Sequence, residues 1–103
     1  MQIIDDNTVV VNNSEEFKKA LSEENDYNYI YLGNDITLTS GFTINANKTN
    51  LIIDGTYNNV KYTYTNNLNE SSDVIEASTS NRKITLKNMN IISSHAYGIV
   101  YVP

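Results

Sequence analysis

Tyrosine side chains are the residues of this sequence whose type and spacing best suit a binding surface. Tyr27, Tyr29 and Tyr31 alternate along one segment, and Tyr62 and Tyr64 alternate along another. Side chains two positions apart share one face of a strand, and aromatic rings on such a face can stack on sugar rings. These five tyrosines are the candidate carbohydrate-binding residues, with at least two of the first three expected to point outward. The alternative is structural, because strands favour tyrosine for packing.

Two aspartates, Asp35 and Asp54, are the acidic residues nearest the predicted turns described below. A pair of carboxylates can bind a cation or act as acid and base in the cleavage of a sugar chain. An aspartate before a turn more commonly accepts a hydrogen bond from its own backbone, and a lyase site also needs an arginine or lysine beside the carboxylates. We therefore expect structural roles, and we assign no catalytic residue, no metal ligand and no cofactor.

The single histidine, His95, can be combined with Ser93, Ser94 and Asp73 into a set of hydrolase-type residues. Neither serine lies in a sequence that resembles a nucleophile elbow, and a histidine in a Ser-Ser-His segment is typical of a surface loop. Asparagine side chains in the turns could coordinate calcium, but asparagine more commonly serves the geometry of the turn itself. Both patterns are therefore interpreted as structural.

Length, charge and composition narrow the class of protein. The chain has 103 residues, no cysteine and a formal net charge of -5. This length suits one domain, and the absence of a basic patch that could neutralise phosphates argues against nucleic acid as a partner. No apolar run approaches the ~20 residues of a membrane-spanning helix, so membrane insertion is not expected. Residues 1–6 show neither the charged nor the apolar region of a signal peptide.

The elements that must position these side chains can be inferred from the hydrophobic pattern. Thr8–Val11 is predicted to be a short strand, and the Asn-Asn-Ser sequence after it offers a helix N-cap. An apolar stripe of Phe17, Ala20 and Leu21 predicts one helix over about residues 14–24. Only strands and turns are predicted from residue 27 onwards.

A short sequence motif, the repeated phrase of this chain, occurs three times. Each copy is a brief apolar run that ends at an asparagine or a glycine. The copies are Ile30–Leu38, Leu51–Gly55 and Ile84–Ile91. Their turn residues, Asn34, Gly55 and Asn88, are of the types that tolerate positive φ. Strands that bend at a repeated position are typical of a solenoid, and the sequence therefore predicts a mostly β fold, a parallel β-helix of about three coils.

Each coil is expected to contain three strands, with a polar loop over residues 65–73 in the second coil. The predicted strands are Ile30–Leu32, Ile36–Leu38 and Phe42–Ile44, then Leu51–Ile53, Val60–Tyr64 and Val74–Ala77, then Ile84–Leu86, Asn90–Ile92 and Gly98–Val102. A small β-sandwich or an α+β sheet of hairpins is the alternative. Hairpin signals are few, because Asp54-Gly55 is the one dipeptide of that kind, and this favours the β-helix.

Stacking of the coils predicts three columns of inward side chains. The columns are Leu32, Ile53 and Leu86, then Ile36 or Leu38, Val60 and Ile91, then Phe42 or Ile44, Val74 or Ile75, and Ile99 or Val100. One coil cannot bury its apolar face alone, so the helix is expected to cover the first coil through Phe17 and Leu21. The last coil would be left open at Leu86, Ile91, Ile99 and Val100, which predicts a homo-oligomer formed through this end.

The stretches Tyr29–Leu38, Leu51–Tyr57 and Ile84–Ile91 resemble coils of the pectate-lyase-like right-handed β-helix family. Together with the helix sequence Ser14–Leu21, they most resemble the pectate-lyase-like adhesive domain of secreted and surface proteins of Gram-positive bacteria. The resemblance covers about residues 8–103 and implies a right-handed path for the coils. Lyases of the family carry calcium-binding carboxylates and basic catalytic residues in later coils, and none of these positions can be matched here.

The resemblance implies a non-catalytic structural or adhesive module, secreted or at the bacterial cell surface, that contacts carbohydrate or a host or cell-surface ligand. The alternative is the first coils of a polysaccharide lyase or glycosidase whose active site lies beyond residue 103. Residues 1–103 are expected to form one domain, with the strand and helix cap in residues 8–26 and the coils in residues 27–103. Because Gly98–Val102 resembles the middle of a coil, we expect a longer parent protein.

Overall fold

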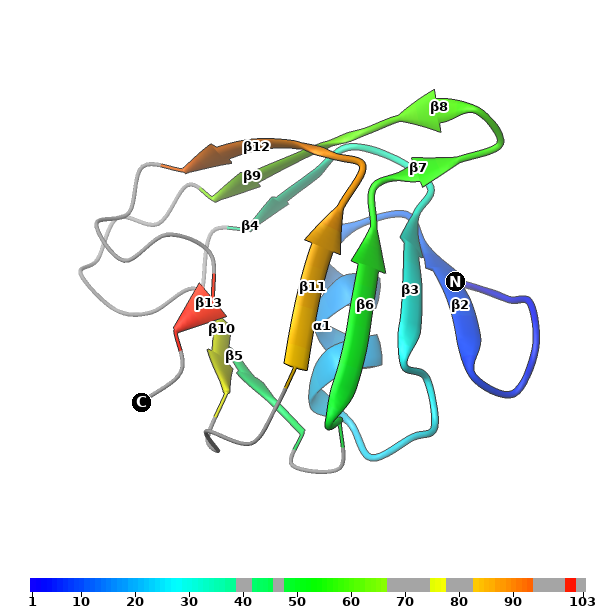
Figure 1. Ribbon diagram of the computed structural model, residues 1–103, viewed down its shortest axis with the longest axis vertical. Coiled ribbons are helices and arrows are strands. Elements are labelled where there is room, and N and C mark those ends of the chain that lie inside the picture. The colour runs from blue at the N-terminus through cyan, green and yellow to red at the C-terminus, as the bar shows by residue number, and fades with distance from the viewer. Residues whose placement is uncertain (39–41, 46–47, 67–74, 78–82, 94–99, 102–103) are drawn as a thin grey trace.

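The computed structural model describes residues 1–38, 42–45, 48–66, 75–77, 83–93 and 100–101. In this part of the chain short strands predominate, and one α-helix lies near the N-terminus (Figure 1). The prediction of a mostly β fold with an N-terminal helix is therefore confirmed. Within the same residues, no helix has the length and apolar character needed to cross a membrane.

Strands form where β-branched and aromatic residues gather, as their preference for a pleated, half-buried surface predicts. In chain order the elements are β1 (Gln2–Ile3), β2 (Thr8–Val11), α1 (Ser14–Ser22), β3 (Tyr29–Leu32), β4 (Ile36–Leu38), β5 (Phe42–Ile44), β6 (Asn50–Asp54), β7 (Thr56–Tyr57), β8 (Val60–Lys61), β9 (Thr63–Asn66), β10 (Ile75–Ala77), β11 (Lys83–Lys87), β12 (Asn90–Ser93) and β13 (Val100–Tyr101). The bounds of β2, β4 and β5 are those predicted. Strands β3 and β12 are one residue longer than predicted at one end, β6 and β11 are one residue longer at each end, and β1 and β7 were not predicted.

Three sheets carry most of these strands, and every pairing in them is parallel except that of β1 with β2. The long sheet has the order β1-β2-β3-β6-β11, the β9 sheet has the order β12-β9-β4, and the β10 sheet has the order β13-β10-β5. From β3 onwards the chain enters the long sheet, then the β9 sheet, then the β10 sheet, and it repeats this order twice more. Each return adds a strand beside the earlier one, as Figure 1 shows for β3, β6 and β11.

Helix α1 begins where the sequence offers a cap. The Asn13 side chain accepts a hydrogen bond from the Glu16 N–H at 2.8 Å, and the Glu16 carboxylate accepts one from the Asn12 N–H at 2.9 Å. The first of these bonds satisfies a donor that the start of a helix leaves unpaired. The helix ends at Ser22, slightly before its predicted end, because Glu23 already has extended backbone.

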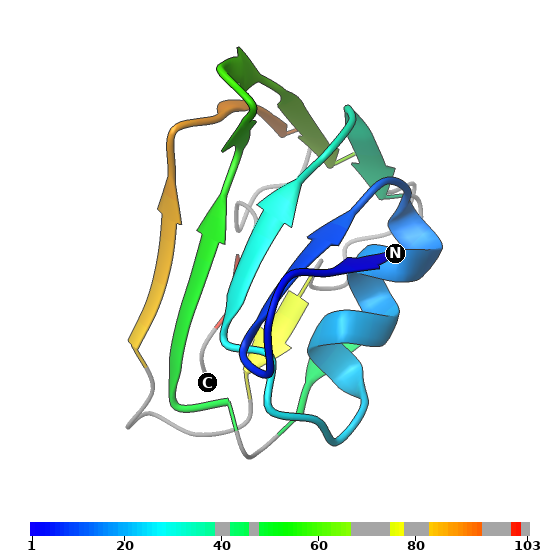
Figure 2. The same ribbon diagram turned by 90° about the vertical axis from the view of Figure 1, so that its right-hand side faces the viewer.

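The helix covers the interior at the end of the long sheet that holds β2. Phe17, Ala20 and Leu21 are buried, as the apolar stripe predicts, and α1 packs against β2, β4 and β5. Figure 2 shows α1 beside β2 and far from β11. The Phe17 ring centroid lies 5.4 Å from that of Tyr64 in β9. Helix α1 therefore lies over the first strands of the three sheets, where the sequence places it.

The register between strands corrects the first predicted column of side chains. Ile30 of β3 pairs with Ile53 of β6, and Ile53 pairs with Leu86 of β11. The prediction of Leu32 at the place of Ile30 is wrong. Leu32 is also buried, but it pairs with Val11 of β2, so the prediction chose the wrong one of the two inward positions of β3.

The other two columns are partly as predicted. The second contains Ile36, Tyr64 and Ile91, and the backbone register aligns Phe42, Ile75 and Val100 in the third. This backbone alignment agrees with one predicted combination, and the side chains of these three residues lie outside the described part of the structure. Val60, predicted for the second column, is 46% exposed, and that prediction is wrong.

A two-residue hairpin explains why Val60 lies outside the core. Strand β7 pairs antiparallel with β8, and the turn residues Asn58 and Asn59 have φ of 52° and 65°. A two-residue turn with positive φ at both positions matches the twist of a hairpin, and asparagine tolerates this conformation better than most residues. The predicted strand Val60–Tyr64 is therefore divided between the hairpin and β9.

The turn residues of the repeated phrase differ in their backbone conformation. Asn88 has φ of 56°, as predicted, whereas Asn34 and Gly55 do not have positive φ. Gly55 is needed for close approach instead, because a Cβ at this position would overlap Met89 and lie 2.8 Å from the carbonyl oxygen of Asn88. The glycine allows the turn after β11 to lie directly against the turn after β6.

Several sequence-based predictions lie outside the described residues. These are most of the polar loop over residues 65–73, the side chains of the hydrolase-type set Asp73, Ser93, Ser94 and His95, and the column position of Ile99.

Candidate functional site

The outer face of the long sheet collects polar and aromatic side chains in rows. Strand register places Tyr31, Asp54 and Lys87 beside one another across β3, β6 and β11. A neighbouring row contains Tyr29 and Ile52. Successive side chains of a strand point to opposite faces, and the position between the two tyrosines of β3 is buried in the core. The two rows therefore face outward.

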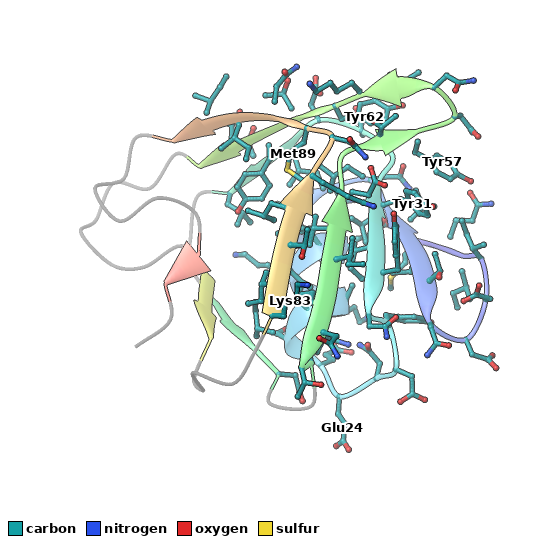
Figure 3. All side chains as sticks on the ribbon, viewed as in Figure 1. Glu24, Tyr31, Tyr57, Tyr62, Lys83 and Met89 are labelled. Carbon is teal, nitrogen blue, oxygen red and sulfur yellow. The ribbon has the colours of Figure 1, made fainter. Side chains whose placement is uncertain are left out.

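Three tyrosines on this face form a continuous group, which we call the tyrosine cluster: Tyr29, Tyr31 and Tyr57. The ring centroids of Tyr29 and Tyr31 lie 4.8 Å apart, and those of Tyr31 and Tyr57 lie 5.3 Å apart. The ring planes are tilted by 44° and 52°, and both centroid distances lie within the ~4.5–7 Å that is usual for aromatic pairs. Figure 3 shows Tyr31 and Tyr57 close together at the end of β3 that faces β7.

Asp54 is a buried carboxylate that is hydrogen-bonded to the tyrosine cluster. Its side chain is only 6% exposed, and it accepts hydrogen bonds from the Tyr29 hydroxyl at 2.8 Å, the Thr56 N–H at 3.0 Å and the Asn88 amide at 3.3 Å. A buried carboxylate needs such donors to offset its loss of hydration. The bond to Thr56 is the backbone bond that the sequence predicts for this aspartate, and the bond to Tyr29 fixes one ring of the cluster.

The electrostatics of the cluster follow from these contacts. Burial and the hydrogen bond to Asp54 raise the pKa of the Tyr29 hydroxyl well above its usual range, so it stays protonated and remains a donor. The ammonium of Lys87 lies 5.4 Å from the centroid of the Tyr29 ring, a distance at which a cation is attracted to the face of an aromatic ring. The side of the cluster nearest β11 is therefore already occupied by a cation.

A pocket of about 640 Å³ opens beside the cluster, and we call it the outer pocket. Its lining includes Tyr31, Tyr57, Asp5, Asp54 and Asn88. The hairpin turn of Asn58 and Asn59 also contributes to its wall. The pocket thus combines two aromatic rings, two carboxylates and several amide groups, which can together bind a small polar molecule.

Tyr64 must be removed from the candidate binding residues. Its side chain is 1% exposed, and its ring packs against Phe17 inside the core. The prediction that Tyr64 contributes to a surface platform is wrong, because Tyr64 shares an inward column with Ile36. Burial raises the pKa of its hydroxyl well above the usual range.

The remaining candidates divide into two groups. Tyr29 and Tyr31 lie in the tyrosine cluster, as described. Tyr27 and Tyr62 are partly buried and pack against the core, so they are not brought together with the cluster. Figure 3 shows Tyr62 near the hairpin, apart from Tyr31. The structure therefore unites two of the five predicted tyrosines.

Tyr57 is a member of the cluster that the sequence reasoning missed. A signal was present, because Tyr57 directly precedes the Asn58-Asn59 pair that forms the hairpin turn. Recognising a hairpin there would have placed Tyr57 in β7, which packs against β3. Lys87 and Asn88 were also missed as neighbours of Asp54, since their proximity depends on the register between β6 and β11.

The other candidate residues do not come together with Asp54 in one site. Asp35 accepts a hydrogen bond from the Thr63 N–H at 2.8 Å, so it joins two successive passes of the chain rather than its own turn. Asp35 is not among the residues of the outer pocket that holds Asp54. In the ranges that the structure describes, no group of three or more histidine, cysteine, aspartate or glutamate residues could hold a metal ion.

A buried amine fixes the loop between α1 and β3. Lys48 is 3% exposed, and its Nζ donates to the carbonyl oxygens of Tyr27 at 2.6 Å and Asn25 at 3.2 Å and to the Asn25 side chain. Burial lowers the pKa of Lys48, while the nearby Asp26 opposes the change. These bonds serve the shape of the loop, so we assign them a structural role.

Comparison with known proteins gives one match. A family model described as "Putative pectate lyase-like adhesive domain" matches residues 8–102, which is nearly the whole chain. Neither the search of curated proteins nor the search of solved structures found a match.

Proposed function

The chain belongs to the pectate lyase-like adhesive domain family, and from this premise we propose that it is a non-catalytic adhesive module of a secreted or surface-attached bacterial protein. In this proposal the module contacts carbohydrate through the tyrosine cluster. Family membership supports the adhesive role. The observation that carries the carbohydrate contact is the aromatic group on an outward sheet face, with rings held at 4.8 and 5.3 Å by neighbouring strands.

The proposal includes the path of the chain, a right-handed parallel β-helix with α1 at its first end. It is supported by the order in which the chain enters the three parallel sheets and by the nearly general right-handedness of parallel strand connections. A rigid stack of this kind would hold outward side chains at the regular spacing of neighbouring strands, about 4.8 Å. An experimental structure with a left-handed connection from β3 to β6 would contradict this part.

Binding to a panel of immobilised bacterial and host glycans tests the carbohydrate contact. We expect binding by the unmodified chain and a loss of about tenfold or more in affinity for the double variant Tyr31→Leu with Tyr57→Leu, because the rings supply the stacking surface. The matched control is Tyr31→Phe with Tyr57→Phe, which retains both rings. Binding that is equally strong in the leucine variant would contradict the role of the cluster.

A separate assay tests the absence of catalysis. We predict that this chain cleaves neither polygalacturonate nor other acidic glycans, with or without calcium, because Asp54 is committed to Tyr29 and Thr56 rather than to a positioned base. The measurement is the ultraviolet absorbance of unsaturated products. An absorbance that grows in proportion to protein concentration and is lost on boiling would contradict the prediction.

A further inference from the structure

The charge of the outer pocket points to a ligand class more specific than carbohydrate in general. Asp5 and Asp54 both line this pocket, and the lining contributed by the described residues contains no lysine or arginine. Lys87, on the strand next to that of Asp54, lies over the Tyr29 ring instead. An anionic sugar such as a uronic acid would therefore bring its carboxylate towards two like charges, which is unfavourable.

The aromatic side chains of the pocket also favour a cation over an anion. The ring centroids of Tyr31 and Tyr57 lie 5.3 Å apart with a tilt of 52°, so the faces of the two rings point in different directions. The face of an aromatic ring attracts a cation. The cluster already shows this behaviour, because the ammonium of Lys87 lies 5.4 Å from the centroid of the Tyr29 ring.

The remaining lining suits a molecule with many hydroxyl groups. Asn58 and Asn59 are exposed at the pocket wall, and their backbone is held in the hairpin turn. Asparagine amides both donate and accept hydrogen bonds, as sugar hydroxyls require. The volume of about 640 Å³ falls within the range of ~300–1,000 Å³ that is usual for small-molecule pockets. A sugar residue suits this lining better than a bare alkyl ammonium.

We propose that the outer pocket binds a glycan that carries a free, protonated amino group, such as a glucosamine unit without its acetyl group. The amine lies against the Tyr31 and Tyr57 rings beside the Asp5 carboxylate, the negative charge of the buried Asp54 also attracts it, and the hydroxyls bond to the amides of the hairpin turn. This inference rests on the proposed carbohydrate contact and names its class.

The test compares three short oligosaccharides of equal length by calorimetry at mildly acidic pH: a glucosamine oligomer, its N-acetylated form and a galacturonate oligomer. We expect tightest binding of the glucosamine oligomer and weakening as salt concentration rises. Asp5→Asn should weaken this binding roughly two- to fivefold, the usual size of one exposed charge contact. Asp5 suits this test better than Asp54, because an asparagine can still accept the bond that Asp5 accepts from the Asn7 N–H.

Two further variants separate specific binding from simple attraction of a polycation to an acidic chain. Asp6→Asn makes the same change of net charge at an exposed residue that does not line the pocket, and we expect it to leave binding unchanged. Tyr57→Leu changes no charge and should weaken binding about tenfold. Equal effects of the Asp5 and Asp6 variants, or no effect of Tyr57→Leu, would overturn the inference.

The outcomes for the two proposals are distinct. Equal or tighter binding of the N-acetylated or galacturonate oligomer would overturn the preference for an amine and leave the carbohydrate contact intact. No binding of any of the three oligomers, together with binding elsewhere in the glycan panel, would overturn this inference alone. No binding in the oligomers or in the panel would overturn both.

Discussion

The hydroxyl group of Tyr64 is the least well satisfied polar group in the described core. The side chain is 1% exposed, and no hydrogen-bond partner for the hydroxyl lies among the described residues. A buried hydroxyl without a partner loses its hydration and gains nothing in exchange. The ring, by contrast, packs against Phe17 at 5.4 Å, so ring and hydroxyl contribute to stability with opposite signs.

We therefore predict that Tyr64→Phe raises the free energy of unfolding by about 1 kcal/mol, because it retains the ring and removes the unsatisfied group. Urea denaturation of both proteins measures the difference. Tyr62→Phe is the matched control, since that ring is only partly buried, and it should change stability little. A loss of stability in Tyr64→Phe would mean that the hydroxyl has a partner after all.

Stability at alkaline pH should depend on the same residue. Burial raises the pKa of Tyr64 above its ordinary value of 10.0, so the folded state keeps this proton at a pH where the unfolded chain releases it. The stabilisation is fully present below pH 10 and is lost as the pH rises above it, by up to about 1.4 kcal/mol per pH unit. The raised pKa of Tyr29 likewise makes stability fall as the pH rises, whereas the lowered pKa of Lys48 makes stability rise with pH.

Denaturation midpoints measured from pH 8 to 11 for the unmodified chain and for Tyr64→Phe test this effect, because Tyr29 and Lys48 are common to both proteins. We expect the decline above pH 10 to be shallower in the variant. Parallel curves would show that Tyr64 ionises equally in both states.

The tyrosines also show what residue patterns can predict. Alternation placed Tyr29 and Tyr31 on one face correctly, since the intervening Ile30 is buried. The same alternation could not assign Tyr64, because a period of two does not say which face is inward. That choice depends on the register with Ile36 and on the ring of Phe17, and both partners are distant in sequence.

Among the elements, α1 contributes most to closing the core at the N-terminal end. Phe17 is fully buried between the helix and the strands. We predict that Phe17→Ala lowers the free energy of unfolding by about 3 kcal/mol or more, because it removes a buried ring and leaves a cavity beside Tyr64. Chemical denaturation measures the loss, and Lys19→Ala on the exposed side of the same helix should have little effect. An unchanged midpoint for Phe17→Ala would contradict the covering role of α1.

The elements were predicted well wherever local patterns decide them. The helix follows from its cap and apolar stripe, and β2, β4 and β5 follow from short β-branched or aromatic runs. The β7–β8 hairpin was missed because its turn is Asn58-Asn59 rather than a pair that contains glycine. Because the hairpin was missed, Val60 was predicted in the core rather than on the surface, and the packing of β7, which holds Tyr57, against β3 was not predicted.

For the whole molecule, the strands farthest from α1 present open edges in the part of the chain that the structure describes. Strands β11 and β12 are each last in their sheets, and Ile91 and Ile92 of β12 are 47% and 57% exposed. Unpaired edges and exposed apolar side chains favour association between chains. A homo-oligomer formed through this end would therefore use the exposed edge of β12.

We predict that the sedimentation coefficient of this chain rises with concentration. Ile92→Lys should shift association to higher concentrations, because a charge on an edge strand disfavours strand pairing. Val60→Lys is the matched control, since Val60 is 46% exposed in the hairpin rather than at the β12 edge. A monomer at every concentration up to the millimolar range would contradict the prediction.

The contact at Gly55 also limits how this sequence can diverge over time. A Cβ at position 55 would lie 2.7 Å from the Cα of Met89 and 2.8 Å from the carbonyl oxygen of Asn88, and every amino acid has these main-chain atoms. No exchange of the Met89 side chain can therefore make room for a larger residue at position 55. The two positions are coupled in one direction: residue 89 can vary as its own packing allows, while residue 55 can change only if the main chain of the turn after β11 moves.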